Sequence, residues 1–115
     1  MSEENNTVTE QQSRQVDALV SLPERVIELC EKRGWSTHWT DRLAYLGLEA
    51  SEFVEAIRGK NGDPVEEAGD VIITALALIV PNGVSLEDAL VAAHKKIDRL
   101  TNTPKYEGEE YTEAN

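Results

Sequence analysis

Four carboxylates stand at matching intervals in the middle of the chain. Glu49 is followed three residues later by Glu52, and Glu67 is followed three residues later by Asp70. Side chains three apart lie one above the other on a helix, so two such pairs on consecutive antiparallel helices can converge. Ligands that are all oxygens favour a hard cation. The spacing therefore predicts a site for Mg²⁺, with Mn²⁺ as a substitute.

Asp70 is the most informative of the four. It precedes a run, residues 71–80, that is apolar apart from Thr74, and burying a carboxylate there is costly unless it is paired or bound to a metal. The simpler interpretation is a solvated acidic face, with Glu66 and Glu67 favoured by the dipole of a helix that starts just before them. That interpretation suits Asp70 poorly, because aspartate is a poor helix former and lies about two turns into the helix.

Four helices must position these carboxylates, and no segment has the alternation of a strand. Start and stop residues predict helices over residues 23–33, 40–58, 64–80 and 86–100, with residues 16–22 as a separate helical piece. The predicted first residues or caps are Pro23, Thr40, Asp63 and Ser85. Gly47, in the middle of the second helix, costs about 1 kcal/mol relative to alanine, which predicts a close helix crossing there.

Length and charge limit the organisation and the partners. The 115 residues, 40% hydrophobic, are the size of one domain. We expect a polar N-terminal segment at residues 1–20, partly disordered or a short helix, a domain over residues 21–101 and an acidic tail over residues 102–115. The net charge of −11 argues against a nucleic-acid partner. Divalent cations can still bridge carboxylates to a phosphorylated small molecule.

Cysteine content and the first residues bear on where the protein is located in the cell. Cys30 is the single cysteine, which excludes an internal disulfide and a zinc site made of cysteines. The first residues resemble no secretory signal, and the longest apolar run is too short to cross a bilayer. We expect a cytoplasmic protein with no membrane partner.

The two acidic pairs, Glu49 with Glu52 and Glu67 with Asp70, follow each other along the chain as they do in a known superfamily. They resemble the motifs of the all-α nucleoside triphosphate pyrophosphohydrolases of the MazG and dUTPase/dCTPase type. The similarity covers residues 22–100 and includes both acidic pairs, the second within "EAGDV". Upstream, "EKRGWSTHW" resembles the RxWxxxH element of the dCTP-pyrophosphatase branch. Lys60 falls where that branch also has a lysine.

The resemblance implies an all-α, four-helix MazG-like bundle and an enzyme that cleaves a nucleoside triphosphate, in particular a deoxynucleotide, to the monophosphate and pyrophosphate. Bound divalent ions would neutralise the triphosphate and activate the attacking water. The general base stays unassigned, because a glutamate that many members have at position 48 is Leu48 here. Glu55 is a candidate, since it continues the spacing of the first pair. The carboxylates that carry over as catalytic residues and metal ligands are Glu49, Glu52, Glu67 and Asp70.

Aromatic residues cluster just after the first predicted helix. Trp35, His38 and Trp39 are large planar side chains in a chain that is only 5% aromatic. A loop platform that stacks a nucleobase would use such residues. The alternatives are that one tryptophan plugs the end of the bundle and that His38 is structural.

Three basic residues are expected to bind the phosphates: Lys60, Lys96 and Arg99. Members of the superfamily have basic residues near the end of the last helix, against the triphosphate tail. Lys96 and Arg99 lie three apart on one face of that helix. The alternative is that they complement the helix dipole.

Residues 71–80 are apolar on every side of their helix, which a four-helix monomer of this size does not cover. We therefore predict a homodimer or tetramer whose subunits complete the bundle. Two other classes of function stay open. A non-catalytic acidic helical interaction module would show no dependence on divalent ions, and a nucleotide-binding sensor would be stabilised by nucleotide without turning it over.

Overall fold

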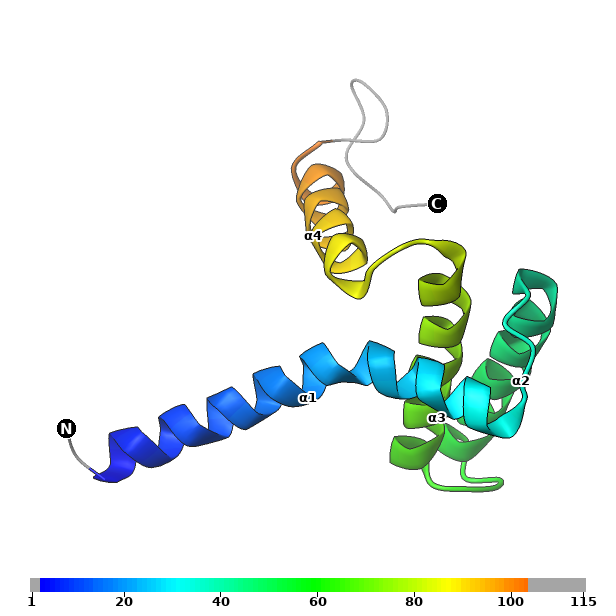
Figure 1. The fold of residues 1–115 in the computed structure, drawn as a ribbon, viewed down its shortest axis with the longest axis horizontal. Coiled ribbons are helices and arrows are strands. Elements are labelled where there is room, and N and C mark those ends of the chain that lie inside the picture. Colours follow the sequence, from blue (N-terminus) through cyan, green and yellow to red (C-terminus); the bar gives the residue numbers. More distant parts are fainter. Residues whose placement is uncertain (1–2, 104–115) are drawn as a thin grey trace. The chain divides into compact units, whose positions relative to one another are not determined.

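The two acidic pairs lie on neighbouring antiparallel helices. The computed structural model describes residues 3–103, and the side chains of residues 9–103. Helix α2 spans Trp39–Ile57 and α3 spans Pro64–Ile79, and the two lie side by side (Figure 1). The other elements are α1 (Glu3–Arg33), the short 3₁₀ helix η1 (Val80–Asn82) and α4 (Leu86–Asn102). The described residues contain no strand, which confirms the all-α fold class.

Local sequence signals explain where α3 and α4 begin. The Asp63 side chain accepts a hydrogen bond from the Val65 amide at 3.1 Å, and Pro64 is the first helical residue. Ser85 accepts a hydrogen bond from the Asp88 amide at 3.1 Å. Both caps satisfy amides that the helix leaves unpaired, and both agree with the prediction.

The start of α2 differs from the prediction. His38, not Thr40, is the N-cap, and its Nδ1 accepts from the Thr40 amide at 3.3 Å. The Thr40 hydroxyl lies 2.8 Å from the same Nδ1. The helix therefore begins at Trp39, because the imidazole provides the acceptor that was expected from threonine.

The start of α1 was also predicted wrongly. Pro23 was expected at a helix start, with residues 16–22 as a separate piece, but a single helix runs from Glu3 to Arg33 with Pro23 inside it. The proline removes one backbone hydrogen bond from the helix. The residues before it include many good helix formers, such as Glu10, Gln11 and Ala18. Their propensity continues the helix through the proline.

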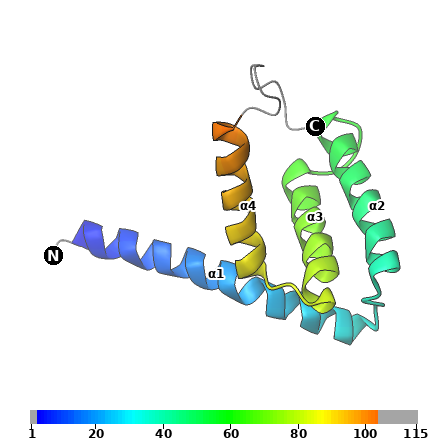
Figure 2. The same cartoon turned by 90° about the horizontal axis from the view of Figure 1, so that it is seen from above.

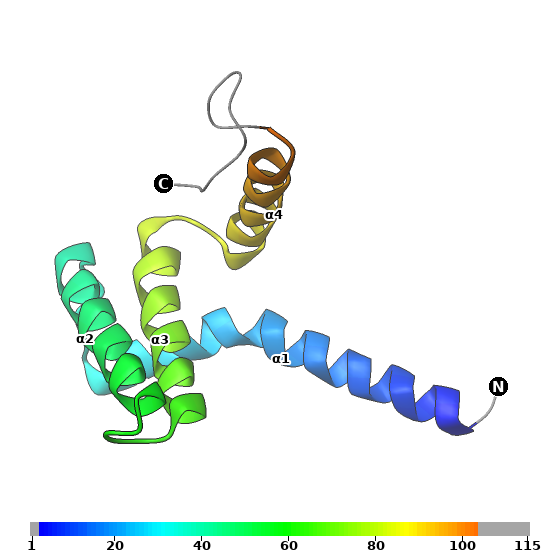
Figure 3. The same ribbon diagram turned by 180° about the vertical axis from the view of Figure 1, so that it is seen from behind.

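Only the C-terminal half of α1 packs on α3. Figures 2 and 3 show this half crossing beside α2 and α3, while the N-terminal half extends away from them. Residues 9–20 are all exposed. The apolar core among the described residues is small and consists of Val26, Cys30, Ala56, Leu76 and Ala77. Gly47 has no atom within 4 Å of where a Cβ would lie, so the close crossing expected there is not formed within the described chain.

The chain divides into two units by contacts. The first ends at Gly83 and holds α1, α2, α3 and η1, and the second begins at Val84 and holds α4. The domain limits expected at residues 21 and 101 stay a prediction. The expected acidic tail lies outside the described residues from position 104 onward.

No single helix in the described part of the chain is long and apolar enough to cross a membrane. The pair Pro64–Asn82 and Leu86–Asn102 reaches that length and composition only when taken together.

Candidate functional site

Three of the four predicted carboxylates come together. Glu49 and Glu52 from α2 and Glu67 from α3 each bring one carboxylate oxygen within 4.8 Å of the others. All three side chains are half-buried. The spacing of three residues and the antiparallel pairing of α2 with α3 together produce this acidic cluster.

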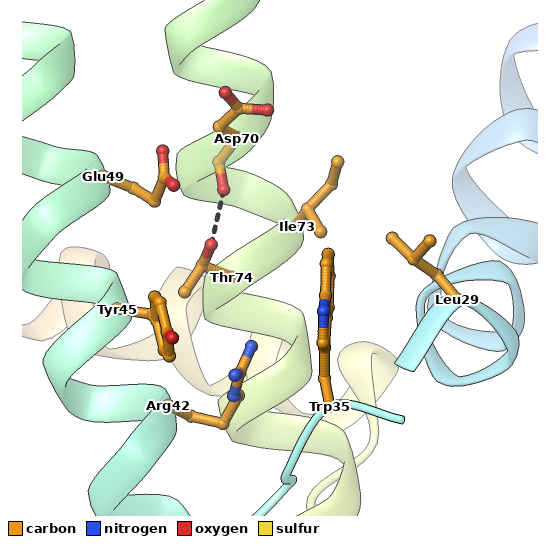
Figure 4. A pocket seen from close by; sticks show the side chains of 8 residues that line it. All are labelled: Leu29, Trp35, Arg42, Tyr45, Glu49, Asp70, Ile73 and Thr74. Carbon is orange, nitrogen blue, oxygen red and sulfur yellow. Dashed lines mark hydrogen bonds between the residues drawn. The ribbon is translucent and has the colours of Figure 1, made fainter. Parts of the chain in front are cut away.

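Asp70 lies beside the acidic cluster without belonging to it. It is half-buried and lines the same cavity as Glu49 (Figure 4). Its backbone carbonyl accepts a hydrogen bond from the Thr74 hydroxyl at 2.8 Å. Its charge acts on the cluster, since it repels the charges of both Glu49 and Glu67.

The electrostatics of the acidic cluster favour a cation. Burial raises the pKa of Glu49, and repulsion by Glu52 and Asp70 raises that pKa further. Burial likewise raises the pKa of Glu67, followed by repulsion from Asp70 and Glu52. Glu49 Oε2 and Glu67 Oε1 are buried without a hydrogen-bond partner among the described residues. Converging carboxylates with unpartnered oxygens fit a hard divalent cation, which would satisfy both the charge and the oxygens.

The α2–α3 loop approaches the acidic cluster closely at Gly62. This residue has φ +84°, and a Cβ there would lie 3.1 Å from Glu67 Oε2. Glycine is therefore favoured both by the left-handed backbone and by the space left beside the carboxylate.

A cavity of about 460 Å³ adjoins the acidic cluster. Its two ends differ in chemistry (Figure 4). Glu49 and Asp70 lie at one end, and Arg42 lies at the other with two aromatic rings. The lining side chains come from α1, from the loop after it, from α2 and from α3: Leu29, Trp35, Arg42, Tyr45, Glu49, Asp70, Ile73 and Thr74.

Arg42 and Tyr45 were missed from the sequence. Arg42 is only 6% exposed, and its guanidinium lies 4.8 Å from the Tyr45 ring centre and 5.9 Å from that of Trp35. The signal that was available is spacing: positions 42, 45, 49 and 52 share one face of a helix. The helix face that carries Glu49 and Glu52 continues toward the N-terminus through Tyr45 and Arg42, so the same spacing rule identifies both residues.

A family model described as phosphoribosyl-ATP pyrophosphohydrolase matches residues 24–97, well over half of the 115 residues. The chain belongs to this family. The phosphoribosyl-ATP pyrophosphohydrolase family is part of the MazG-like all-α superfamily, which confirms the resemblance found in the sequence. Its members are metal-dependent hydrolases of acid anhydrides in nucleotides. Comparisons with curated proteins and with solved structures gave no match.

Within this family member, the predicted aromatic residues divide into two groups. Trp35 lines the cavity, and its amide donates to the Cys30 carbonyl at 2.9 Å at the end of α1. His38 and Trp39 are exposed and stack on each other with ring centres 5.6 Å apart, and neither lines the cavity. The role of His38 as N-cap supports the structural alternative for this residue. Contact of His38 and Trp39 with substrate stays a prediction.

The predicted basic residues lie in the α2–α3 loop and on α4. Lys60 is exposed in the α2–α3 loop, and its amide donates to the Glu55 carbonyl at 3.0 Å. Lys96 and Arg99 are exposed on α4, in the second unit. Their contact with a phosphate tail stays a prediction for this family member.

Proposed function

We propose that the protein is a Mg²⁺-dependent nucleoside triphosphate pyrophosphohydrolase that converts a deoxynucleoside triphosphate to the monophosphate and pyrophosphate. The observation that carries the proposal is the pair of buried, unpartnered oxygens, Glu49 Oε2 and Glu67 Oε1, in the acidic cluster beside a cavity. A volume of about 460 Å³ lies in the range of small-molecule sites.

The carboxylates have the central role in this proposal. Glu49, Glu52 and Glu67 would hold the cation with Asp70 as the fourth predicted ligand, and these four carboxylates are the proposed catalytic residues. A divalent cation held there supplies charge neutralisation and Lewis acidity at the triphosphate. The packing of α2 on α3 brings the carboxylates together, which reduces the reorganisation needed on binding.

The rest of the cavity receives the nucleoside. Trp35 offers a face for stacking the base. Lys60, Lys96 and Arg99 are proposed to bind the phosphate tail, with His38 and Trp39 as further substrate contacts. The proposed partners are the nucleotide and other copies of the chain, in a cytoplasmic homodimer or tetramer. The net charge of −11 supports the absence of a nucleic-acid partner.

Phosphoribosyl-ATP is the second candidate substrate, and the family match favours it. It carries a 5′-triphosphate, so the same carboxylates would serve the same cleavage. It differs from a simple nucleotide by a second ribose phosphate on the base, which the cavity would also have to accommodate.

The decisive experiment incubates the protein with Mg²⁺ and each common nucleoside triphosphate, with phosphoribosyl-ATP as a further arm. Chromatography and ³¹P NMR identify the products. Monophosphate with pyrophosphate supports the proposal, and release of single phosphate contradicts the cleavage position. Stabilisation by nucleotide without product would indicate a sensor, and no response to nucleotide or Mg²⁺ would indicate an interaction module.

Glu67→Gln is the first variant to test. It removes a charge from the acidic cluster while keeping the shape of the side chain, so turnover should be lost with the helical circular dichroism retained. Glu66→Gln is the matched control, because Glu66 is the exposed neighbour on α3. Full activity of Glu67→Gln would remove this residue from the site.

A further inference from the structure

Within the described residues of the first unit, Arg42 is a buried cation without a counter-charge. It is 6% exposed, and its Nε is buried without a hydrogen-bond partner in the described part of the chain. No carboxylate in that part forms an ion pair with it. Burying an unpaired charge is unfavourable, so a charge or hydrogen-bond acceptor from elsewhere is expected at this position.

The two neighbouring aromatic rings satisfy only part of this requirement. Trp35 and Tyr45 lie on either side of the guanidinium (Figure 4). Cation–π contacts use the faces of a guanidinium and leave its N–H groups along the edge free to donate. Arg42 lines the cavity, and the terminal N–H groups of its guanidinium, which are not buried and form no hydrogen bond to the described residues, are available to a planar ligand that presents hydrogen-bond acceptors.

The distance along α2 indicates which part of a nucleotide reaches Arg42. Glu49 lies seven residues further along the same helix, which is about 10 Å at about 1.5 Å per residue. With the triphosphate at the acidic cluster, a residue two turns away lies at the other end of a nucleoside. Arg42 thus faces the base.

We propose that Arg42 determines base specificity by donating two parallel hydrogen bonds to adjacent acceptors on the base. The proposal rests on the proposed function, since it takes the acidic cluster as the phosphate end. Guanine offers adjacent acceptors at O6 and N7, and cytosine offers them at O2 and N3. Adenine and thymine place a donor next to each acceptor on the corresponding edges. The site therefore selects guanine or cytosine nucleotides over adenine nucleotides, which include the second candidate substrate, phosphoribosyl-ATP, because a mismatched base leaves buried donors unpaired.

Arg42→Lys tests this assignment. Lysine keeps the charge but lacks the planar fork that donates two parallel bonds. The ratio of kcat/KM for the better of dGTP and dCTP to that for dATP should fall at least about fivefold. Arg58→Lys, at the exposed C-terminal cap of the same helix, should leave the ratio unchanged. An unchanged ratio in Arg42→Lys overturns the proposal, as does an equal loss for all four nucleotides.

A ligand-binding measurement tests the role of Arg42 independently of whether the protein hydrolyses triphosphates. The wild-type protein with Mg²⁺ is titrated with each of the four deoxynucleoside monophosphates, and its thermal stability is followed. Greater stabilisation by dGMP or dCMP, lost in Arg42→Lys, supports the assignment even if no triphosphate is hydrolysed. The comparison of dGMP with dCMP identifies the base.

The wild-type ranking also decides the question if Arg42→Lys fails to fold by circular dichroism. Preference for dAMP or TMP, or no preference among the four, overturns the role of Arg42 whether or not hydrolysis is observed.

Discussion

Glu49 and Glu67 show how single residues prepare this site for a cation. Their half-burial and the neighbouring carboxylates favour the protonated form of each, so the pKa of each is raised. A proton and a metal ion compete for the same oxygens. The acidic cluster should therefore hold a divalent cation more weakly as the pH falls through these raised pKa values.

The stability of the metal-free protein should instead increase as the pH falls, whereas cation binding weakens. Because the pKa of Glu49 is raised from 4.5 in the folded protein, its contribution to stability is fully present below pH 4.5 and is lost as the pH rises through the folded pKa. Thermal unfolding in EDTA, measured at pH values from below 4.5 upward, should show a decrease in Tm as the pH rises. Glu49→Gln should reduce this dependence of Tm on pH. Glu55→Gln should retain it, because Glu55 is exposed on the same helix. An identical pH profile in Glu49→Gln would contradict the expectation.

Magnesium should stabilise the protein through the same residues. A ligand that binds only the folded state adds about 2.7 kcal/mol at 100 times its Kd, so Tm should rise with Mg²⁺ at neutral pH. Glu67→Gln should lose most of this rise, whereas Glu66→Gln should keep it. Differential scanning fluorimetry with a Mg²⁺ titration measures both. Equal shifts in the two variants would show that the ion binds elsewhere.

At the scale of elements, the α2–α3 hairpin sets the geometry of the acidic cluster. Asp63 caps α3, and Gly62, with its positive φ, brings the loop next to Glu67. The start of α3 and the position of this carboxylate are consequently fixed by adjacent residues. A change in the loop should affect both stability and the site.

Two glycine substitutions separate these effects. Gly62→Ala places a Cβ at positive φ and next to Glu67, and should cost about 1–2 kcal/mol together with a loss of Mg²⁺ binding. Gly47→Ala adds a Cβ in open space inside α2 and should stabilise by about 0.5–1 kcal/mol. Urea unfolding and Mg²⁺ titration of both variants check this. If Gly62→Ala binds Mg²⁺ normally, the loop does not position Glu67.

The sequence predicted those features of the elements that depend on local rules. The caps at Asp63 and Ser85 follow from side-chain oxygens next to free amides, and the acidic cluster follows from helical periodicity. The length of α1 was missed because Pro23 was interpreted by its usual position rather than by the helix formers before it. Arg42 was missed because its importance comes from burial between two rings, and one of these, Trp35, lies in a different element.

At the scale of the whole molecule, the first unit, which ends at Gly83, buries little apolar surface by itself. Five of the described apolar residues in this unit are buried, while large apolar side chains remain exposed on α2 and α3, among them Leu43 at 55% and Ile72 at 52%. Surface of this kind on a small chain favours self-association. This supports the proposed homodimer or tetramer.

Ile72→Glu should shift the protein toward the monomer. A charge in the middle of an exposed apolar face opposes its burial against a second copy. Sedimentation velocity measures the change, and Ser51→Glu, which adds a charge at an exposed polar position on α2, is the control. A monomeric wild-type protein, or an unchanged oligomer in Ile72→Glu, would exclude association through this part of α3.

Helix α2 carries side chains from both ends of the cavity, with Arg42 and Tyr45 at one end and Glu49 at the other. Since a regular helix resists stretching, the distance along the helix between these two ends of the cavity is fixed. Two turns of α2 then set the length of the molecule that can touch both ends at once. The backbone would thereby limit the length of the proposed substrate, in addition to the limits that the side chains place on its chemistry.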